Sequence, residues 1–156
     1  MKSKIYLAAP LFSEAEKTFN IKLKKKLEIY FDVYLPQEDG MLIVDLVKKG
    51  ISFAHASEMV FDADINAINA SDVLLIVLDG RTVDEGAAME LGFAYSKGKR
   101  CIGYSTDPRR LLPDGQNPMI TGCLETIVNS TEDLCKHLFG QKGACQYANR
   151  SYIVCS

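Results

Sequence analysis

Carboxylate side chains are the groups in this sequence whose surroundings favour chemistry over a purely structural role. Glu90 lies in the segment 79–98, DGRTVDEGAAMELGFAYSKG, which begins where a continuous apolar run ends. On a helix, its neighbours three and four positions away are Gly, Ala, Phe and Ala, so no cation stands at a pairing distance. A carboxylate on a small, apolar helix face is a costly choice for stability alone. Glu90 is therefore a candidate functional residue, and the alternative is a solvated glutamate on a helix surface.

Other acidic residues lie near the same predicted edge of the fold. Asp84 precedes the predicted helix, where an aspartate also commonly serves as a plain N-terminal cap. Asp64 shares a helical stripe with apolar residues, which turns it partly inward. Asp107 and Arg109 follow a predicted strand and could line the rim of a cleft, or could simply pair with each other.

The sequence lacks the motifs and residue sets that several other kinds of active site require. The sequence has no GxxxxGK[ST], GxGxxG or GxSxG motif. His55 and His137 are isolated, which leaves a Ser/His/Asp site or a multi-histidine metal site incomplete. Carboxylates remain, and they suit glycosidic bond cleavage, in which one carboxylate attacks the anomeric carbon while another assists the leaving group.

Strand-like and helix-like segments alternate along the chain. Strands are predicted at residues 4–8, 32–35, 73–78, 101–104 and 125–128, and helices at 13–30, 41–50, 55–70, 84–96 and 131–139. Ser13, with Glu16 three residues later, gives the first helix a capping-box pattern. This alternation predicts an α/β protein with a three-layer flavodoxin-like or Rossmann-like fold and a five-stranded parallel sheet. Such sheets bind ligands at the carboxyl ends of their strands. Residues 1–156 are expected to form one domain, with a C-terminal tail from about residue 140.

Composition narrows the possible partners. The 156 residues are 47% hydrophobic and 24% charged, with a net charge of -2, which gives no general reason to bind nucleic acid or an anionic membrane. No apolar run approaches the roughly 20 residues that span a bilayer. The five cysteines lack CxxC spacing, which argues against a zinc site or a disulfide framework. A cytoplasmic location is the simplest expectation.

In these residues and in the segments around them, the chain resembles the nucleoside 2-deoxyribosyltransferases. The similar features are the N-terminal KIYLAAPLF, the pattern D-x-G-x-x-x-E-[LIF]-G beginning at Asp84, and the following GKRCIGYSTDPR. They extend from about residue 4 to residue 119. The resemblance implies that Glu90 is the nucleophile of a covalent deoxyribosyl-enzyme intermediate. It implies that Tyr6 orients this glutamate and that Asp64 faces the base as a proton donor.

The resemblance also implies a set of substrate-binding residues: Asp84, Gly86, Gln37, Asn117 and Met119. Asp84 would contact the base and the 5′-hydroxyl, Gln37 would contact the base, and Asn117 would come from a neighbouring subunit. The implied partners are nucleosides and free nucleobases, in a dimer-based homo-oligomer with shared active sites. No metal or organic cofactor is implied. The family's C-terminal aromatic carboxylate has no secure counterpart, although Tyr152 could replace it.

Three alternatives follow from the same residues. The first is a hydrolase of nucleosides or of nucleoside 5′-monophosphates, but relatives that act on monophosphates carry Ser where this chain has Asp84. Like charges about 4 Å apart cost on the order of 1 to 4 kcal/mol in solvated or surface-like surroundings, so Asp84 favours an uncharged 5′-hydroxyl. A phosphoribohydrolase would need a PGGxGT loop, which is absent. A non-catalytic nucleotide-binding domain of similar fold is the third.

Overall fold

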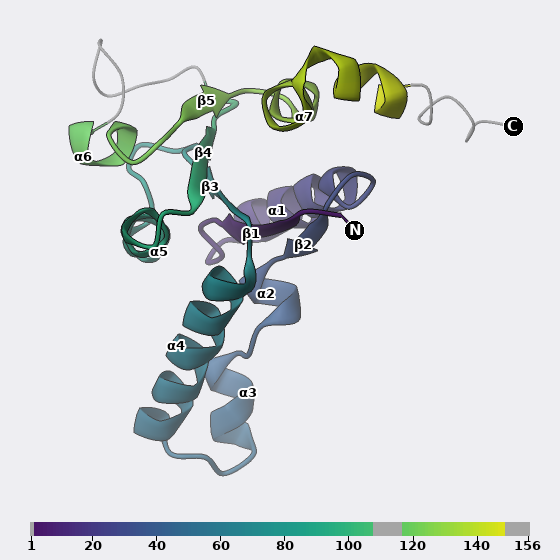
Figure 1. Ribbon diagram of the computed structural model, residues 1–156. Helices are drawn as coiled ribbons and strands as arrows, with labels where there is room; N and C mark the ends of the chain where they lie inside the picture. The colour runs from purple at the N-terminus through teal and green to yellow at the C-terminus, as the bar shows by residue number, and fades with distance from the viewer. Residues whose placement is uncertain (1, 108–116, 149–156) are drawn as a thin grey trace, which may run out of the picture.

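A five-stranded parallel sheet forms the centre of the molecule (Figure 1). The computed structural model describes residues 2–107 and 117–148. The strands are β1 (Lys4–Ala8), β2 (Asp32–Tyr34), β3 (Val73–Val77), β4 (Arg100–Tyr104) and β5 (Thr126–Val128), in the order β2-β1-β3-β4-β5. All four neighbouring pairs are parallel. The predicted fold class, a three-layer flavodoxin-like fold with a five-stranded parallel sheet, is confirmed.

Helices cover both faces of the sheet. They are α1 (Glu14–Leu27), α2 (Pro36–Asp39), α3 (Ile43–Lys48), α4 (Phe53–Ala70), α5 (Glu85–Ser96), α6 (Pro118–Thr121) and α7 (Thr131–Ala148). Residues of α1 and α7 pack in one apolar cluster with the sheet, and residues of α4 and α5 pack in a second cluster. Figure 1 shows α3 and α4 side by side, extending away from the sheet.

Strand residues divide between the two clusters because successive side chains of a strand point to opposite faces. On β1, Ile5 and Leu7 join the cluster with α1, whereas Tyr6 and Ala8 join the cluster with α4 and α5. All five residues of β3 are buried, as expected for a central parallel strand that is covered on both faces. A polar side chain on the Tyr6 face of β1 is therefore enclosed between the sheet and two helices.

The order of the strands fixes where a ligand can enter. From β1 the chain moves outward to β2, and it then returns past β1 to form β3, β4 and β5. The direction of winding reverses between β1 and β3. In open α/β sheets, the crevice at this reversal, outside the carboxyl ends of the strands, is the usual binding site.

Some element boundaries differ from the sequence-based predictions. The helices α2 and α6 were not predicted, because four residues are too few to show helical periodicity. The expected last helix, 131–139, ends at a kink at Gly140, which has a non-helical φ of 72°, and a further helical segment continues to Ala148. The helix α1 begins with the predicted capping box, in which the Ser13 hydroxyl accepts from the Glu16 N–H while the Glu16 carboxylate accepts from the Ser13 N–H. Arg109 and Tyr152 lie outside the described residues.

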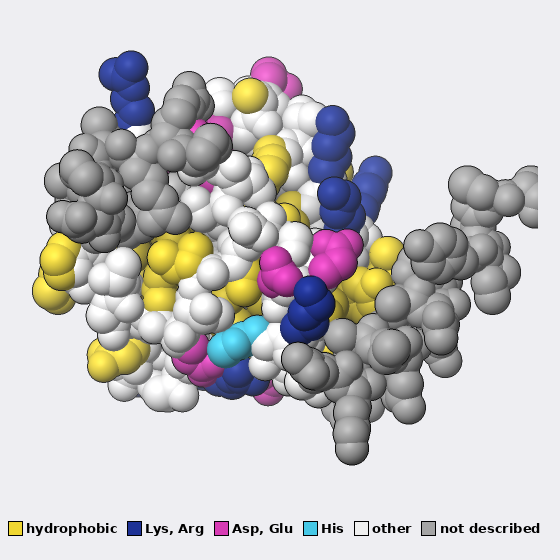
Figure 2. Space-filling model, turned by 90° about the horizontal axis from the view of Figure 1, so that it is seen from above, with side chains coloured by type: hydrophobic (Ala, Val, Ile, Leu, Met, Phe, Trp, Pro, Cys, Tyr) yellow, Lys and Arg dark blue, Asp and Glu magenta, His cyan; other side chains and the backbone are white. Residues whose placement is uncertain are grey.

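The surface carries mixed charge. Figure 2 shows a face on which basic, acidic and apolar side chains are interspersed, in keeping with the small net charge of -2. Within residues 2–107 and 117–148, no helix has both the length and the apolar character needed to cross a bilayer.

Candidate functional site

The centre of the site is a hydrogen bond between β1 and α5. The Tyr6 hydroxyl donates to Glu90 Oε1 at 2.8 Å. Glu90 reaches it because α5 buries the stripe Ala87, Leu91 and Ala94 against the sheet, and position 90 lies beside this stripe on the helix. Tyr6 has no exposed surface, so its hydroxyl has a fixed direction. Because the tyrosine holds Oε1, the second oxygen of Glu90 is left for other chemistry.

Asp64 completes this group from α4. It stands one helical turn before the buried Ile68, which turns its carboxyl group towards the sheet. Burial raises the pKa of Asp64 to about 6, although the nearby Tyr6 hydroxyl lowers it. The structure therefore brings Tyr6, Asp64 and Glu90 together from three separate parts of the chain.

The two carboxyl groups do not ionise independently. Burial raises the pKa of Glu90 to about 7, the Tyr6 hydrogen bond lowers it, and the negative charges of Asp64 and Asp84 raise it. Burial also raises the pKa of Tyr6 far above its usual value, as do the charges of Glu90 and Asp64, so the hydroxyl remains a donor. A carboxyl pair of this kind holds a single proton between its two ionisation steps. That state provides one carboxylate nucleophile and one carboxylic acid.

Asp84 borders the group as the N-terminal cap of α5. Its Oδ2 accepts from the Ala87 N–H at 2.9 Å, so the capping role that the sequence allowed is present. The cap uses one oxygen and leaves the other for a ligand. Gly86 follows directly, and a Cβ there would stand 3.1 Å from Asp84 Oδ2. Glycine thus lets the carboxylate sit close to the helix backbone.

Gln37 lies at the start of α2, on the wall of an open cleft of about 650 Å³ that Asp64 also lines. Most of the wall is apolar, including Leu11, Phe12, Leu42 and Val60. A cleft of this volume could hold a flat apolar ligand with a polar edge.

The Gln37 amide is already engaged within the protein. Its Oε1 accepts from the Asn20 amide at 2.9 Å, and its Nε2 donates to the Lys17 carbonyl at 3.1 Å. Gln37 therefore fixes α2 to α1, and contact with a ligand would use the remaining hydrogen-bonding capacity of its amide.

The structure does not bring Asn117 and Met119 into this acidic group. Both are exposed on or beside α6, where Asn117 Oδ1 accepts from the Met119 N–H at 2.9 Å. The Met119 side chain is 79% exposed. Among the described residues, neither side chain has a hydrogen bond to Tyr6, Asp64 or Glu90.

Two residues near the site were missed by the sequence reasoning. Tyr34 on β2 stacks against Tyr6, with ring centroids 5.5 Å apart and planes inclined by 18°. Asp79, in the loop directly after β3, accepts from the Thr106 N–H, the Thr106 hydroxyl and the Asp107 N–H. Asp79 thereby ties together the loops that follow β3 and β4. Its place directly after a buried strand was a usable signal, whereas the Tyr34 contact depends on strand register.

The chemistry available here is that of carboxyl groups. Within the described part of the chain, no group of three or more His, Cys, Asp or Glu side chains is arranged to hold a metal ion. Among those same residues, none of the salt bridges involves Asp64, Asp84 or Glu90. The site can provide a nucleophilic carboxylate, a proton donor and a fixed hydroxyl that hydrogen-bonds to the nucleophile.

Comparison with known proteins gives a consistent family. The family model described as nucleoside 2-deoxyribosyltransferase matches residues 5–146. A conserved protein from Enterococcus faecalis V583 is similar in structure, with a TM-score of 0.71 and 30% identity over 94% of this chain and 99% of that one. A 2-deoxyribosyltransferase from the psychrotolerant bacterium Bacillus psychrosaccharolyticus has a TM-score of 0.70 and 27% identity, covering 85% and 90% of the two chains.

A more distant structure shares the fold alone. The CMP N-glycosidase BcmB of Clostridium botulinum is 15% identical, with a TM-score of 0.50 over 88% of this chain and 98% of that one. Among curated protein sequences, none matches this chain significantly.

Proposed function

Because the chain belongs to the nucleoside 2-deoxyribosyltransferase family, we propose that it transfers a 2-deoxyribosyl group from one nucleobase to another. The substrates in this proposal are nucleosides and free nucleobases. The observation that supports it is the Tyr6–Glu90 hydrogen bond beside the half-buried Asp64. This arrangement provides a nucleophile and a proton donor in one place.

In the first step, the free oxygen of Glu90 attacks C1′ of the nucleoside. A C1′–O bond forms while the C1′–N bond breaks, and the bonding electrons leave with the base. Asp64 gives its proton to the departing base, which avoids release of an anion. The sugar is then esterified to Glu90, and Tyr6 continues to hold the other carboxyl oxygen.

In the second step, a nitrogen of the acceptor base attacks C1′ from the opposite side. The C1′–O bond to Glu90 breaks, and the proton that the acceptor loses goes to Asp64. Two inversions give net retention of configuration. Positive charge develops on the sugar in both transition states, and the nearby carboxylates stabilise it electrostatically.

Asp84 is proposed to bind the 5′-hydroxyl through the oxygen that does not cap α5. An uncharged hydroxyl can donate to this carboxylate, whereas a 5′-phosphate would be repelled by it and by Glu90. Nucleosides are therefore preferred over nucleoside 5′-monophosphates. Gln37, in the wall of the apolar cleft, is proposed to lie on the base side.

The decisive test of this function is product analysis. The protein would be incubated with deoxyinosine, with and without free adenine or cytosine, and the products separated by chromatography. A new deoxynucleoside that forms only with the acceptor supports transfer. Hypoxanthine and free deoxyribose in equal amounts with or without acceptor would make the protein a hydrolase. If the protein reacted neither with nucleosides nor with deoxynucleoside monophosphates, the remaining interpretation would be a non-catalytic nucleotide-binding domain.

Gly86→Ala is expected to raise KM for the nucleoside by roughly three- to tenfold. The new Cβ would stand 3.1 Å from Asp84 Oδ2 and displace this carboxylate by a few tenths of an ångström. The stability should stay close to that of the wild type, because the preference of alanine over glycine in a helix, at most about 1 kcal/mol, is opposed by weakening of the Asp84 cap, which is worth about the same. Gly92→Ala on the same helix is the matched control, since its Cβ meets nothing within 4 Å. Equal KM values in the two variants would contradict this role for Asp84.

We also infer a homo-oligomer in which Asn117 completes the site of a neighbouring subunit. Support comes from exposed apolar side chains that a monomer would leave in water, among them Phe12, Phe53 and Met119, which are 76%, 68% and 79% exposed. Light scattering at assay concentration should give a mass of two chains or a multiple of two. A monomer that retains full activity would contradict the shared site.

A further inference from the structure

Tyr34 is the nearest aromatic neighbour of the residue that holds Glu90. The strands β1 and β2 pair in parallel with Tyr6 directly opposite Tyr34, so both rings project from the same face of the sheet. The rings are stacked, with centroids 5.5 Å apart and an interplanar angle of 18°. One side of the Tyr6 ring is therefore in contact with Tyr34.

Tyr34 is held in turn by the backbone that follows β2. A Cβ built on Gly40 would stand 3.2 Å from the Tyr34 hydroxyl and 2.5 Å from the Pro36 carbonyl. The absence of a side chain at Gly40 lets the end of α2 close over this hydroxyl. The Tyr34 ring thus contacts Tyr6 on the neighbouring strand, and its hydroxyl lies close to the turn at Gly40.

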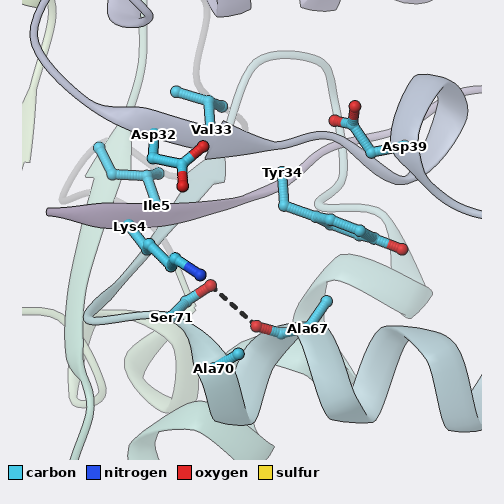
Figure 3. A pocket seen from close by; sticks show the side chains of 9 residues that line it. All are labelled: Lys4, Ile5, Asp32, Val33, Tyr34, Asp39, Ala67, Ala70 and Ser71. Carbon is cyan, nitrogen blue, oxygen red and sulfur yellow. Dashed lines mark hydrogen bonds between the residues drawn. The ribbon is translucent and has the colours of Figure 1, made fainter. Parts of the chain in front are cut away.

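On another side, Tyr34 borders a cavity of about 330 Å³ between the β1–β2 edge and α4. Figure 3 shows the ring of Tyr34 extended across this space, with Ala67 and Ala70 of α4 on the opposite wall. Only small side chains of α4 face the ring across this cavity. The stack between the two rings therefore matters for the position of both.

We propose that Tyr34 is a positioning residue, which acts through its stack on Tyr6 to keep the Tyr6 hydroxyl directed at Glu90. This role in catalysis rests on the proposed function, in which Glu90 is the nucleophile. Without the stack, the phenol ring could rotate about its side-chain bonds towards the cavity, and the 2.8 Å hydrogen bond would lengthen.

Electrostatics provides a readout that a general loss of packing would not imitate. The groups that face Glu90 are Tyr6 on β1, Asp64 on α4 and Asp84 at the start of α5. The Tyr6 hydrogen bond lowers the pKa of Glu90, whereas burial and the two carboxylates raise it. A weaker Tyr6 contact should therefore raise the pKa of Glu90, but greater access of water would lower it.

The experiment compares Tyr34→Leu, which keeps apolar bulk, with Tyr34→Phe, which keeps the ring and removes only the hydroxyl. The Glu90 carboxyl would be titrated by carbon NMR in the full chain. Tyr34→Leu should raise its pKa by roughly half a unit to one unit and lower kcat/KM about tenfold. Tyr34→Phe should leave both close to wild type. An unchanged or lower pKa in Tyr34→Leu would overturn the proposal.

A double-mutant cycle tests whether the effect passes through Tyr6. In a Tyr6→Phe background, Tyr34→Leu should produce no further change in the pKa of Glu90, because the hydrogen bond has already been removed. An equal shift in both backgrounds would mean that Tyr34 acts on Glu90 by another route. The titration does not need turnover, so an inactive protein that shows the expected shifts would refute the proposed function and leave the positioning role standing.

Discussion

Glu90→Gln is expected to lower transfer by at least about 10³-fold, because it removes the attacking oxygen anion and keeps the shape of the side chain. The amide can still accept the Tyr6 hydrogen bond, so the fold around the site should persist. Mass spectrometry of wild-type protein mixed with donor nucleoside should detect one added deoxyribosyl group. The same measurement on Glu90→Gln should detect none.

The stability of this variant should change in the opposite direction to its activity. Burial raises the pKa of Glu90 from 4.5 to about 7, so the folded state binds a proton that the unfolded state has already lost between these values. The associated stability is complete below pH 4.5 and is lost as the pH rises through 7. At pH 8, Glu90→Gln should therefore raise Tm by a few degrees.

A neighbouring glutamate offers the matched control. Glu85→Gln changes an exposed carboxylate on the same helix and should leave activity unchanged, and its Tm should fall slightly rather than rise, because a negative charge in the first turn stabilises a helix. If Glu90→Gln retained a tenth or more of wild-type transfer, the nucleophile would have to be a different group.

Asp64→Asn is expected to lower transfer by roughly 10²- to 10⁴-fold, the usual contribution of a positioned general acid. The loss should depend on the donor, because a base that departs readily as an anion needs less help from a proton. Measurement of kcat/KM for a series of nucleosides with different base acidities would reveal this dependence. Asp62→Asn, an exposed aspartate two residues earlier, is the control and should behave as wild type.

The pH profile provides a second test of the same residue. With pKa values of about 6 for Asp64 and about 7 for Glu90, the pair carries two protons below pH 6, one between these values and none above pH 7. In the major one-proton form the proton is on Glu90, which has the higher pKa, and the reactive form is the minor one with the proton on Asp64. The wild-type kcat/KM should therefore be bell-shaped with a maximum near pH 6.5. The profile of Asp64→Asn should lose its alkaline limb. Its acid limb should shift to lower pH, because the negative charge that raises the pKa of Glu90 is gone. If the pH dependence of kcat/KM stayed bell-shaped in Asp64→Asn, a residue other than Asp64 would have to be the proton donor.

The fold and part of the site could be predicted because their signals are local. The apolar run 73–78 and the capping pattern at Ser13 each act within a few residues, and both led to elements that the structure confirms. The apolar neighbours of Glu90 three and four positions away likewise indicated a candidate functional carboxylate. Such features need no knowledge of which strands pair or how they are aligned.

The remainder depends on long-range geometry. Tyr6 and Tyr34 stack only because β1 and β2 pair in one particular register, and a shift by one residue would place the two rings on opposite faces. The engagement of the Gln37 amide with α1 also arises from packing between elements. Helices of four residues, such as α2, show no periodicity from which they could be predicted.

The site is assembled from distant parts of the chain, and this ties its presence to completion of the fold. Tyr6 and Glu90 are separated by 84 positions, and Asp64 enters from a third element. A contact between residues so far apart in the sequence forms late in folding, after the local helices have formed. A partly folded chain with intact helices but an unpaired β1 would contain no such site. Enzymatic activity can therefore report on native topology, where helical content measured by circular dichroism cannot.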